Sequence, residues 1–534
     1  MKRNAIIMAA GTASRFAPLS YEKPKALLRV KGEILIERQI CQLREAGISD
    51  IIVVVGYLAD RFYYLQEEFG VRIVLNPDYN QYNNTSSLIR VLEELGDTYI
   101  CSSDNYFPNN VFLAHSNESF YSALYSSGKT NEYCISTDKE GNIIDVKVGG
   151  KNSWYMVGHV YFNNDFSTKF KEIMKKEYEK ESTRHEYWED VYIKYINDLP
   201  PMKIHKYHSH DIEEFDSLEE LRLFDETYIY NTGCQMFKNI CQILKCEEKD
   251  IYEINVLKKG MTNCSFAFTC KTDGNRYVYR HPGAGTDEII NRNNEYSSLL
   301  LAKKEHLDDT FIAMDPATGW KISHYIDNVE TLNAETIQYK KNISTIVSIY
   351  KKLHHTSFSM KHEFNIFREI EKYDMLIMQH NATMYEGWDT IKNKILLIED
   401  KLAKLGQELC PCHNDAVPEN FIKTKDGRIF LIDWEYSGRN DPMADIAALF
   451  LESSFSEENQ TRFLNLYFEG EIPPTAIKKI RYYQILWDFL WAQWTIIKEA
   501  RGDNFGTYGK DRYYRGVHNL TSTRIIYSKN GEKK

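Results

Sequence analysis

The segment CPCHNDAVPENFI (410–422), followed by IFLIDWEYSG (429–438), decides how the second half of this chain folds. Asp415 and Asn420 are five residues apart, and Asp433 ends an apolar run shortly afterwards. A loop with an N-cap residue and an unrelated surface acid is the alternative interpretation. The length of the string, joined to a strand that ends in an acid, makes this alternative much the weaker one.

This segment resembles the catalytic loop of the choline kinase and aminoglycoside phosphotransferase group, which shares the protein-kinase fold. The resemblance implies that Asp415 orients the acceptor hydroxyl and takes its proton. It implies that Asn420 and Asp433 hold Mg²⁺ on ATP. We therefore expect an α+β bilobal protein-kinase-like domain, and we place it at residues 235–534.

The segment IYEINVLKKGMTNCSFAFTC (251–270) predicts the start of an upper lobe, because its apolar residues alternate around a Gly-Met-Thr-Asn turn. By the resemblance, Thr262 and Asn263 belong to the nucleotide loop. Arg280 takes the place of a phosphate-contacting lysine, and Glu295 pairs with it. Choline kinases have arginine here, although its planar fork contacts phosphate differently from lysine.

A helical pattern near the C-terminus places Trp491 and Trp494 three residues apart, on one face. Core packing is the common reason for such a stripe. In choline kinases a W-x-x-W helix lines the choline pocket together with an acid, for which Glu452 aligns here. Phe455 or Tyr508 is left to supply the remaining wall. Ring faces and a carboxylate suit a cation that donates no hydrogen bonds.

The first half contains AAGTASRFAPLSYEKPKALL (9–28) directly after a short apolar run. Small residues such as Gly11 let backbone N–H groups approach a triphosphate, and Arg15 and Lys25 add positive charge. An ordinary βα turn with a basic loop is the alternative. The Pro-Leu and Pro-Lys pairs within the string argue against it.

These residues resemble the sugar-nucleotide pyrophosphorylase superfamily, although Ala13 stands where the family usually has a second glycine. The resemblance implies a Rossmann-like α/β nucleotidyltransferase domain with a mostly parallel sheet, which we place at residues 1–228. It implies that Lys25 neutralises charge on the α-phosphate of the nucleotide. It also implies that Arg15 holds the departing pyrophosphate.

Two acids complete this expected site. The segment 99–107 resembles the family's strand that ends in a metal-binding acid, here Asp104, and Asp190 offers the second carboxylate. Mg²⁺ prefers such hard oxygen ligands. A helix cap or a surface charge is the alternative for either aspartate taken alone.

Three segments, at 76–88, 153–162 and 185–192, resemble the phosphocholine cytidylyltransferase branch of the superfamily. Within the first, Asn84 and Ser86 are candidates to read the base or ribose of CTP. Trp154, Tyr187 and Trp188 are candidates for an aromatic box around a quaternary ammonium. For each of these three rings, filling the core is an equally good interpretation.

The bulk composition of the 534 residues limits the classes of function. A formal net charge of −10 argues against nucleic-acid binding. No apolar run reaches the ~20 residues of a membrane helix, so we expect no membrane insertion. The ten cysteines are scattered, and the spacing of Cys410 and Cys412 suits neither a zinc knuckle nor a redox motif. Reduced thiols in a cytoplasmic protein are the expectation.

Taken together, the resemblances imply an enzyme with two activities. The C-terminal half would phosphorylate choline with ATP, and the N-terminal half would join phosphocholine to CTP, with Mg²⁺ at both sites. Three alternatives remain open: an ethanolamine-specific equivalent, a sugar-nucleotide enzyme fused to an antibiotic kinase, and a non-catalytic nucleotide-binding regulator. The retained metal acids argue against the last. The sequence leaves a homo-oligomer open.

Overall fold

A computed structural model describes residues 3–113, 116–257, 263–283, 285–358 and 360–529. The chain forms two compact units, one holding residues up to Val256 together with Thr269–Thr272, the other holding the rest. Each unit is described by itself. The domain limits predicted from the sequence, 1–228 and 235–534, stay a prediction, because packing units and functional domains need not end at the same residue.

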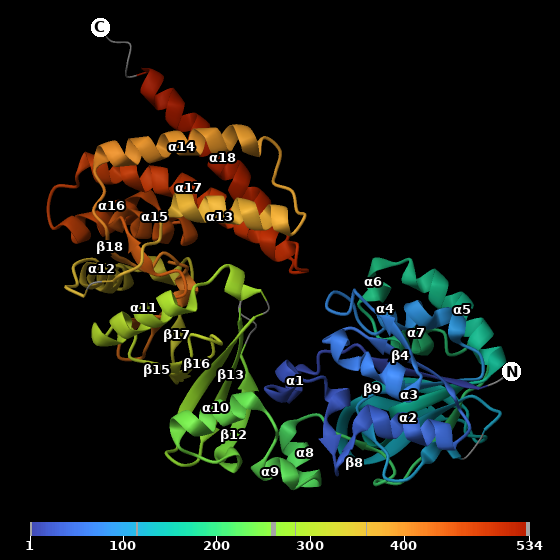
Figure 1. Ribbon diagram of the computed structural model, residues 1–534. Coiled ribbons are helices and arrows are strands. Elements are labelled where there is room, and N and C mark those ends of the chain that lie inside the picture. The colour runs from blue at the N-terminus through green and yellow to red at the C-terminus, as the bar shows by residue number, and fades with distance from the viewer. Residues whose placement is uncertain (1–2, 114–115, 258–262, 284, 359, 530–534) are drawn as a thin grey trace. The chain divides into compact units, whose positions relative to one another are not determined.

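The first unit is built on one seven-stranded sheet in the order β10-β8-β9-β6-β1-β4-β5 (Figure 1). Its strands are β1 (Asn4–Ala9), β4 (Asp50–Val55), β5 (Arg72–Leu75), β6 (Thr98–Ser102), β8 (Phe120–Thr137), β9 (Ile143–Phe162) and β10 (Lys203–Lys206). Strands β1, β4, β5 and β6 run parallel, as do β8 and β10, whereas β9 is antiparallel to both of its neighbours. The predicted α/β fold with a mostly parallel sheet is confirmed.

Both faces of this sheet are buried, which explains why β1 and β4 are continuous apolar runs rather than alternating ones. Ala5 and Ile7 of β1 pack into one core with α2 (Leu35–Glu45), and Ile6 packs into the other with α5 (Asn164–Tyr178).

The remaining elements are α1 (Leu19–Glu22), β2 (Arg29–Val30), β3 (Glu33–Ile34), α3 (Tyr64–Phe69), α4 (Thr85–Leu88), β7 (Asn105–Tyr106), α6 (Glu181–Arg184), α7 (Trp188–Lys194), β11 (Glu213–Glu214), α8 (Leu218–Phe224), α9 (Thr227–Tyr230), α10 (Gln235–Leu244) and β12 (Ile251–Val256), besides short 3-10 turns.

One buried carboxylate ties α5 to the end of α7. Glu177 accepts hydrogen bonds from Lys180 (2.5 Å), Lys194 (2.6 Å) and the Tyr195 hydroxyl (2.6 Å). Burial alone would raise the pKa of Glu177, but these three donors hold it down, at about 2. Because the pKa is lower in the folded state, the stabilisation is present above about pH 5 and is lost as the pH falls toward 2.

We expect Glu177→Gln to lower the free energy of unfolding of the first unit by about 2 kcal/mol at pH 7, allowing for the partial exposure of both lysines. The difference from wild type should shrink at pH 3. The measurement is a urea titration in which limited proteolysis reports how much of the first unit is unfolded, and it gives this free energy of unfolding. The exposed neighbour Glu179 provides the control, since Glu179→Gln should change the unfolding free energy little at either pH. An equal loss at pH 7 and pH 3 would contradict the assignment to this carboxylate.

The second unit begins with strands in the order β13-β14-β16-β15, in which β16 is antiparallel to both β14 and β15. These are β13 (Asn263–Cys270), β14 (Arg276–Pro282), β15 (Phe311–Met314) and β16 (Lys321–His324), with helix α11 (Arg292–Lys304) between β14 and β15 in the chain. Strand β13 lies within the segment 251–270, whose alternating pattern predicted the start of an upper lobe. The Gly260-Met261-Thr262 part of the expected nucleotide loop lies outside the described residues.

A helical lobe follows in the chain, in which α13, α14 and α18 each pack against α17 (Figure 1). Its helices are α12 (Lys340–His354), α13 (Ile366–Gln379), α14 (Trp388–Leu405), α15 (Pro442–Glu452), α16 (Glu457–Phe468), α17 (Pro474–Glu499) and α18 (Tyr508–Lys529). Its short strands are β17 (Glu330–Thr331), β18 (Cys410–Cys412), β19 (Phe421–Lys423), β20 (Ile429–Leu431) and β21 (Gly438–Asn440). The C-terminal half of α17 is buried almost all round, as expected for the central helix of a lobe. In the part of the chain that the structure describes, no helix is long and apolar enough to cross a membrane.

Candidate active sites

The loop that contains Asp415 is held by a buried aspartate on α15. The backbone N–H groups of His413 and Asn414 each donate to the Asp445 carboxylate at 2.8 Å. His354 reaches the same carboxylate through Nε2 at 3.1 Å. The pairing of β18 with β21 fixes the backbone directly before the loop. A short segment with little regular structure is thereby fixed from several sides.

Asp415 and Asn420 are in contact, as their spacing suggests. The Asn420 amide donates to the Asp415 backbone oxygen at 2.9 Å and to its carboxylate at 3.3 Å. Burial raises the pKa of Asp415, and the nearby carboxylates of Asp433 and Glu452 raise it further. Acids gathered in a low-dielectric site favour the binding of cations. The arrangement fits a metal–nucleotide complex and a cationic substrate.

A buried network of two arginines and two glutamates lies beside this loop. Arg280 binds Glu295 through both guanidinium ends (2.5 and 3.1 Å) and Glu435 at 2.8 Å. Arg292 contacts the same two glutamates at 2.8 Å each. The Asn263 amide also donates to Glu435, at 2.7 Å. The expected partners Arg280 and Glu295 are thus brought together, while their roles toward the nucleotide stay predictions.

Sequence reasoning missed Arg292 and the contacts of Glu435. Arg292 lies three residues before Glu295 on α11, a spacing that puts both side chains on one helix face. Glu435 follows Asp433 by two residues, in the segment already singled out. Both positions therefore carried a local signal, although the contacts of Glu435 with Arg280 and Arg292 join residues far apart in the chain.

Aromatic rings form a wall next to the acidic loop. Trp491 meets the ring of Tyr436 edge-on at 5.2 Å and that of Trp494 at 6.1 Å, and Trp494 packs on Phe505 at 5.1 Å. Trp491 and Trp494 are 7% and 3% exposed, so both are also part of the core. Core packing and a ring-walled pocket are therefore compatible here. Sequence reasoning missed Tyr436 and Phe505.

Glu452, the acid expected in this pocket, already has a cationic partner. Its Oε2 pairs with Arg512, whose guanidinium carbon lies 4.7 Å from the centre of the Tyr508 ring. Arg512 also reaches Asp488 at 3.4 Å. Among the described residues, the buried Oε1 of Glu452 has no hydrogen-bond partner. One carboxylate oxygen is thus held in place by Arg512, and the other is buried without a partner among the described residues.

In the first unit, the expected pair Lys25 and Asp104 are in contact. Lys25 Nζ lies 2.8 Å from Asp104 Oδ2 and 4.9 Å from the centre of the Phe16 ring. Glu214 joins them from β11, which pairs with β7 directly after Asp104. Burial and the Asp104 charge raise the pKa of Glu214 to about 7, against the opposing effect of Lys25. Glu214 was missed because it lies 110 positions after Asp104 in the chain.

The loop that follows β1 meets the same region through Arg15. Arg15 forms an exposed ion pair of 2.8 Å with Asp216, two residues after Glu214. Ala13, which replaces the usual glycine, takes a left-handed conformation (φ 45°) that glycine adopts with less strain. A Cβ at Gly11 would meet no atom within 4 Å, so the space beside this backbone is open. The substitution at Ala13 has kept the loop geometry that glycine favours.

Asp190 contacts other groups. One of its oxygens accepts from the Tyr133 hydroxyl and the other from the Tyr187 backbone N–H, both at 2.9 Å, which caps α7. This is the helix-cap alternative raised from the sequence. Its role as second metal ligand stays a prediction, and Glu214 is the acid that the structure brings beside Lys25 and Asp104.

The polar candidates Asn84 and Ser86 belong to hydrogen-bond networks. Asn84 accepts from the Trp188 backbone N–H at 2.7 Å and donates to Glu189 at 3.1 Å. Ser86 is fully buried and bonds Asn76 at 2.9 Å. These contacts are enough to explain both residues structurally, and readout of CTP by them stays a prediction.

The three proposed box aromatics differ in their surroundings. Trp188 is 3% exposed and lies in the core, stacked on Tyr121, which matches the core-filling interpretation. Tyr187 is 47% exposed. The Trp154 ring lies under the ammonium of Lys206 at 4.9 Å, so it already faces a cation. Trp154 and Tyr187 keep ring surface for a ligand, whereas Trp188 has little.

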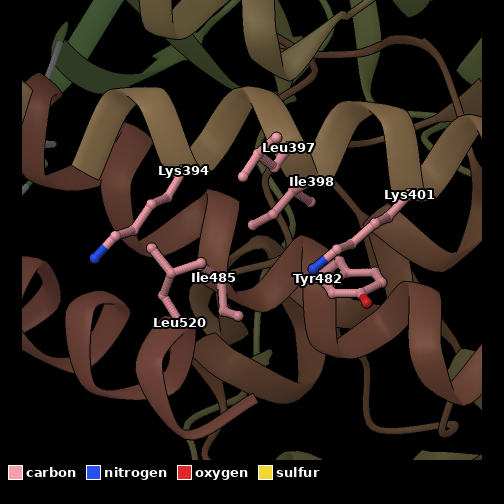
Figure 2. Close-up of a pocket in the computed structure, with 7 residues that line it drawn as sticks. All are labelled: Lys394, Leu397, Ile398, Lys401, Tyr482, Ile485 and Leu520. Carbon is pink, nitrogen blue, oxygen red and sulfur yellow. The ribbon is translucent and has the colours of Figure 1, made fainter. Parts of the chain in front are cut away.

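A small hollow between α14, α17 and α18 holds none of the predicted site residues (Figure 2). Lys394, Lys401 and Tyr482 are among the residues that line it, and its volume is about 40 Å³. That is near the volume of one water molecule, far below that of a nucleotide or choline pocket. It is not a candidate active site.

Comparison with known proteins matches the two halves of the chain to two different families. Residues 254–515 match the choline/ethanolamine kinase family, and residues 5–119 match the MobA-like NTP transferase domain. The 2-aminoethylphosphonate cytidylyltransferase of Lancefieldella rimae is 36% identical over 233 residues, covering 43% of this chain and 94% of that protein. The choline-phosphate cytidylyltransferase of Streptococcus pneumoniae is 35% identical over 222 residues, covering 42% and 96%. Protein LicA of Haemophilus influenzae is 32% identical over 251 residues, covering 45% and 91%. The predicted kinase-like fold of the second half is confirmed by its family match.

Proposed function

The chain belongs to the choline/ethanolamine kinase family through its C-terminal half and to the cytidylyltransferases through its N-terminal half, and we propose that it makes CDP-choline from choline in two steps. The kinase half transfers a phosphoryl group from ATP to choline. The other half joins phosphocholine to CTP and releases pyrophosphate. The order of the two halves in the chain is thus the reverse of the order of the reactions.

The observation that carries the kinase step is that the Glu452 carboxylate and the ring of Tyr436, which packs on Trp491, both lie near Asp415. A trimethylammonium group offers no N–H donor, so ring faces and a carboxylate are the groups that bind it. Arg512 holds one oxygen of Glu452, which fixes the position of the carboxylate. An ethanolamine-specific enzyme would need several acceptors for the three N–H donors of a primary ammonium.

In the phosphoryl transfer, the Asp415 carboxylate orients the choline hydroxyl and takes its proton as the O–P bond forms. The side-chain nitrogen of Asn420 donates to Asp415. The side-chain oxygen of Asn420 is therefore available to bind a metal ion together with the Asp433 carboxylate. These hard oxygens fit Mg²⁺, which when bound neutralises charge on the nucleotide phosphates. Arg280 and Glu295 keep the adjoining buried network in one arrangement.

In the cytidylyl transfer, a phosphocholine oxygen attacks the α-phosphate of CTP. Lys25 places its ammonium where negative charge develops, and Arg15 binds the departing pyrophosphate. Asp104, Glu214 and Asp216 are the acids that fit Mg²⁺ here, because the first two meet beside Lys25 and Asp216 adjoins Arg15. Asp190 acts in this proposal chiefly as the cap of α7.

The match to a 2-aminoethylphosphonate enzyme gives the N-terminal half a second candidate substrate. That molecule has a carbon–phosphorus bond, which phosphorylation of a hydroxyl does not make. A kinase in the same chain supplies a phosphate ester instead. The fusion itself therefore favours phosphocholine over the phosphonate.

The test is incubation of the whole protein with choline, ATP, CTP and Mg²⁺, followed by mass analysis of the products. We expect phosphocholine and CDP-choline, with phosphocholine forming when CTP is omitted. Parallel reactions with ethanolamine, with 2-aminoethylphosphonate, and with UTP or dTTP in place of CTP separate the alternatives. A faster reaction with ethanolamine would overturn the pocket described above, and preferential use of the phosphonate would overturn the assignment of the N-terminal substrate.

A comparison of two acids tests the metal site of the first unit. Glu214→Gln should raise the Mg²⁺ concentration needed for half-maximal cytidylyl transfer at least about tenfold, because it removes a charged oxygen ligand beside Asp104. Asp190→Asn should change that concentration less than Glu214→Gln does. Magnesium titrations of both variants, with phosphocholine supplied, measure the difference. The reverse order of effects would make Asp190 the metal ligand.

From the sequence we also propose that the catalytic domains are residues 1–228 and 235–534. We propose that the protein acts in the cytoplasm. Gel filtration of the whole protein would establish whether it forms a homo-oligomer.

A further inference from the structure

Two thiols and an imidazole meet immediately before the catalytic loop of the kinase half. Cys410 and Cys412 lie on β18, and His354 ends α12. One ligand atom from each of these side chains lies within 4.8 Å of the other two. We propose that Cys410, Cys412 and His354 form a Zn²⁺ site, separate from the magnesium site on Asn420 and Asp433.

The positions of the sulfur atoms fit a tetrahedral ion. Their separation is 3.8 Å. Two sulfurs bound at about 2.3 Å with a tetrahedral angle lie about 3.8 Å apart. Alternate residues of a strand point to the same side, so an extended Cys-x-Cys segment presents both thiols together. Pairing of β18 with β21 keeps the segment extended.

The histidine is held as zinc-binding histidines usually are. Its Nε2 lies 3.1 Å from the Asp445 carboxylate, which also accepts two backbone N–H groups of the catalytic loop. A carboxylate accepts only, so Nε2 carries the proton and Nδ1 keeps its lone pair. In this structure the Tyr467 hydroxyl, 2.8 Å from Nδ1, donates to that lone pair, and an ion bound to Nδ1 would take the place of this hydrogen bond. A carboxylate behind a neutral imidazole is the usual support of a zinc ligand.

The nature of the donors selects the ion. Thiolate and imidazole bind Zn²⁺ well, while Mg²⁺ prefers oxygen, so the magnesium required by the kinase reaction would not compete. Cys412 and His354 are 0% and 6% exposed, and Cys410 is partly exposed, which leaves one side for entry. Three protein ligands leave a fourth position, which a water would fill.

A Zn²⁺ ion bound to these three residues would hold the catalytic loop in place. Only His413 and Asn414 separate Cys412 from Asp415, and His354 contacts the Asp445 carboxylate that holds the loop backbone. An ion on these ligands would tie α12 to β18 and resist movement of the loop. Its expected effect is on the thermal stability of the kinase half. The chemistry of phosphoryl transfer stays with Asp415.

The test uses the whole protein, kept reduced with a phosphine, stripped with a chelator and titrated with Co²⁺ and then Zn²⁺. We expect one Co²⁺ per chain, with the thiolate charge-transfer and visible absorption of a tetrahedral site, and displacement by Zn²⁺. Cys410→Ser and Cys412→Ser should each weaken the apparent affinity for Zn²⁺ at least about 100-fold. Cys41→Ser, which removes an exposed thiol of the first unit, is the matched control.

Circular dichroism shows whether each variant is folded, and the wild-type spectrum decides the question even if one variant is not. Absence of thiolate–Co²⁺ absorption in the folded, reduced wild-type protein would overturn the proposal. So would an unchanged spectrum in folded Cys410→Ser. A Cys410–Cys412 disulfide that persists under the reductant, seen as two thiols that resist alkylation, would also overturn it.

Discussion

Asp415→Asn is expected to slow choline phosphorylation about 10³-fold, because an amide does not accept the proton of the choline hydroxyl. The Asn420 amide would keep its contact with the Asp415 backbone oxygen, so the loop should stay in place. Cytidylyl transfer by the same chain, with phosphocholine supplied, should remain near the wild-type rate. Separate assays of the two half-reactions on one protein sample measure both.

The control for this variant is Glu419→Gln. Glu419 lies in the same loop but is exposed, and its substitution should change the phosphorylation rate less than about twofold. If Asp415→Asn kept more than about a tenth of the wild-type rate, another group would have to be the proton acceptor. An equal loss of both half-reactions would instead point to a folding defect.

The second large effect is expected in the other half of the chain. Lys25→Met should lower cytidylyl transfer by about 10²- to 10³-fold, because it removes a positive charge aimed at the α-phosphate. Lys25 is 9% exposed and pairs with Asp104 at 2.8 Å, beside Glu214. Without it, two neighbouring carboxylates lose their internal cation. Initial rates of pyrophosphate release from CTP and phosphocholine measure the loss.

Lys23→Met is the matched control, since Lys23 is exposed two residues earlier on the same segment. Its cytidylyl transfer should stay near wild type, and choline phosphorylation should be unchanged in both lysine variants. Near-normal cytidylyl transfer in Lys25→Met would remove this residue from the catalytic assignment.

The Asp415→Asn and Lys25→Met variants also test how phosphocholine moves from the kinase site to the cytidylyltransferase site. A mixture of Asp415→Asn and Lys25→Met proteins should make CDP-choline from choline, because phosphocholine released by one chain can diffuse to another. A mixture that makes phosphocholine but no CDP-choline would show that the intermediate does not pass between chains.

The parts of the fold that followed from the sequence are those set by local backbone geometry. The apolar runs of β1 and β4, and the helical spacing of Ile36, Ile40 and Leu43 on α2, are local patterns typical of buried parallel strands and a covering helix. The contact of Asp415 with Asn420 is also local, because five residues of loop leave few ways to arrange them. The long β8–β9 pairing was not predicted in its extent, because register over such a length depends on partners elsewhere.

In the sites, the sequence by itself determined which residues can do chemistry, and the tertiary structure decided which of them meet. Lys25 with Asp104, and Arg280 with Glu295, were named from motifs and are in contact. Arg512, the partner of Glu452, carried no motif of its own.

The same limit applies to Glu214 and to His354. The spacing of Cys410 and Cys412 alone argued against a metal site, and only the fold brings His354 beside them. Spacing within a helix, strand or short loop fixes where side chains point relative to one another. Contacts between residues a hundred positions apart depend on how whole elements pack, and no local pattern encodes that.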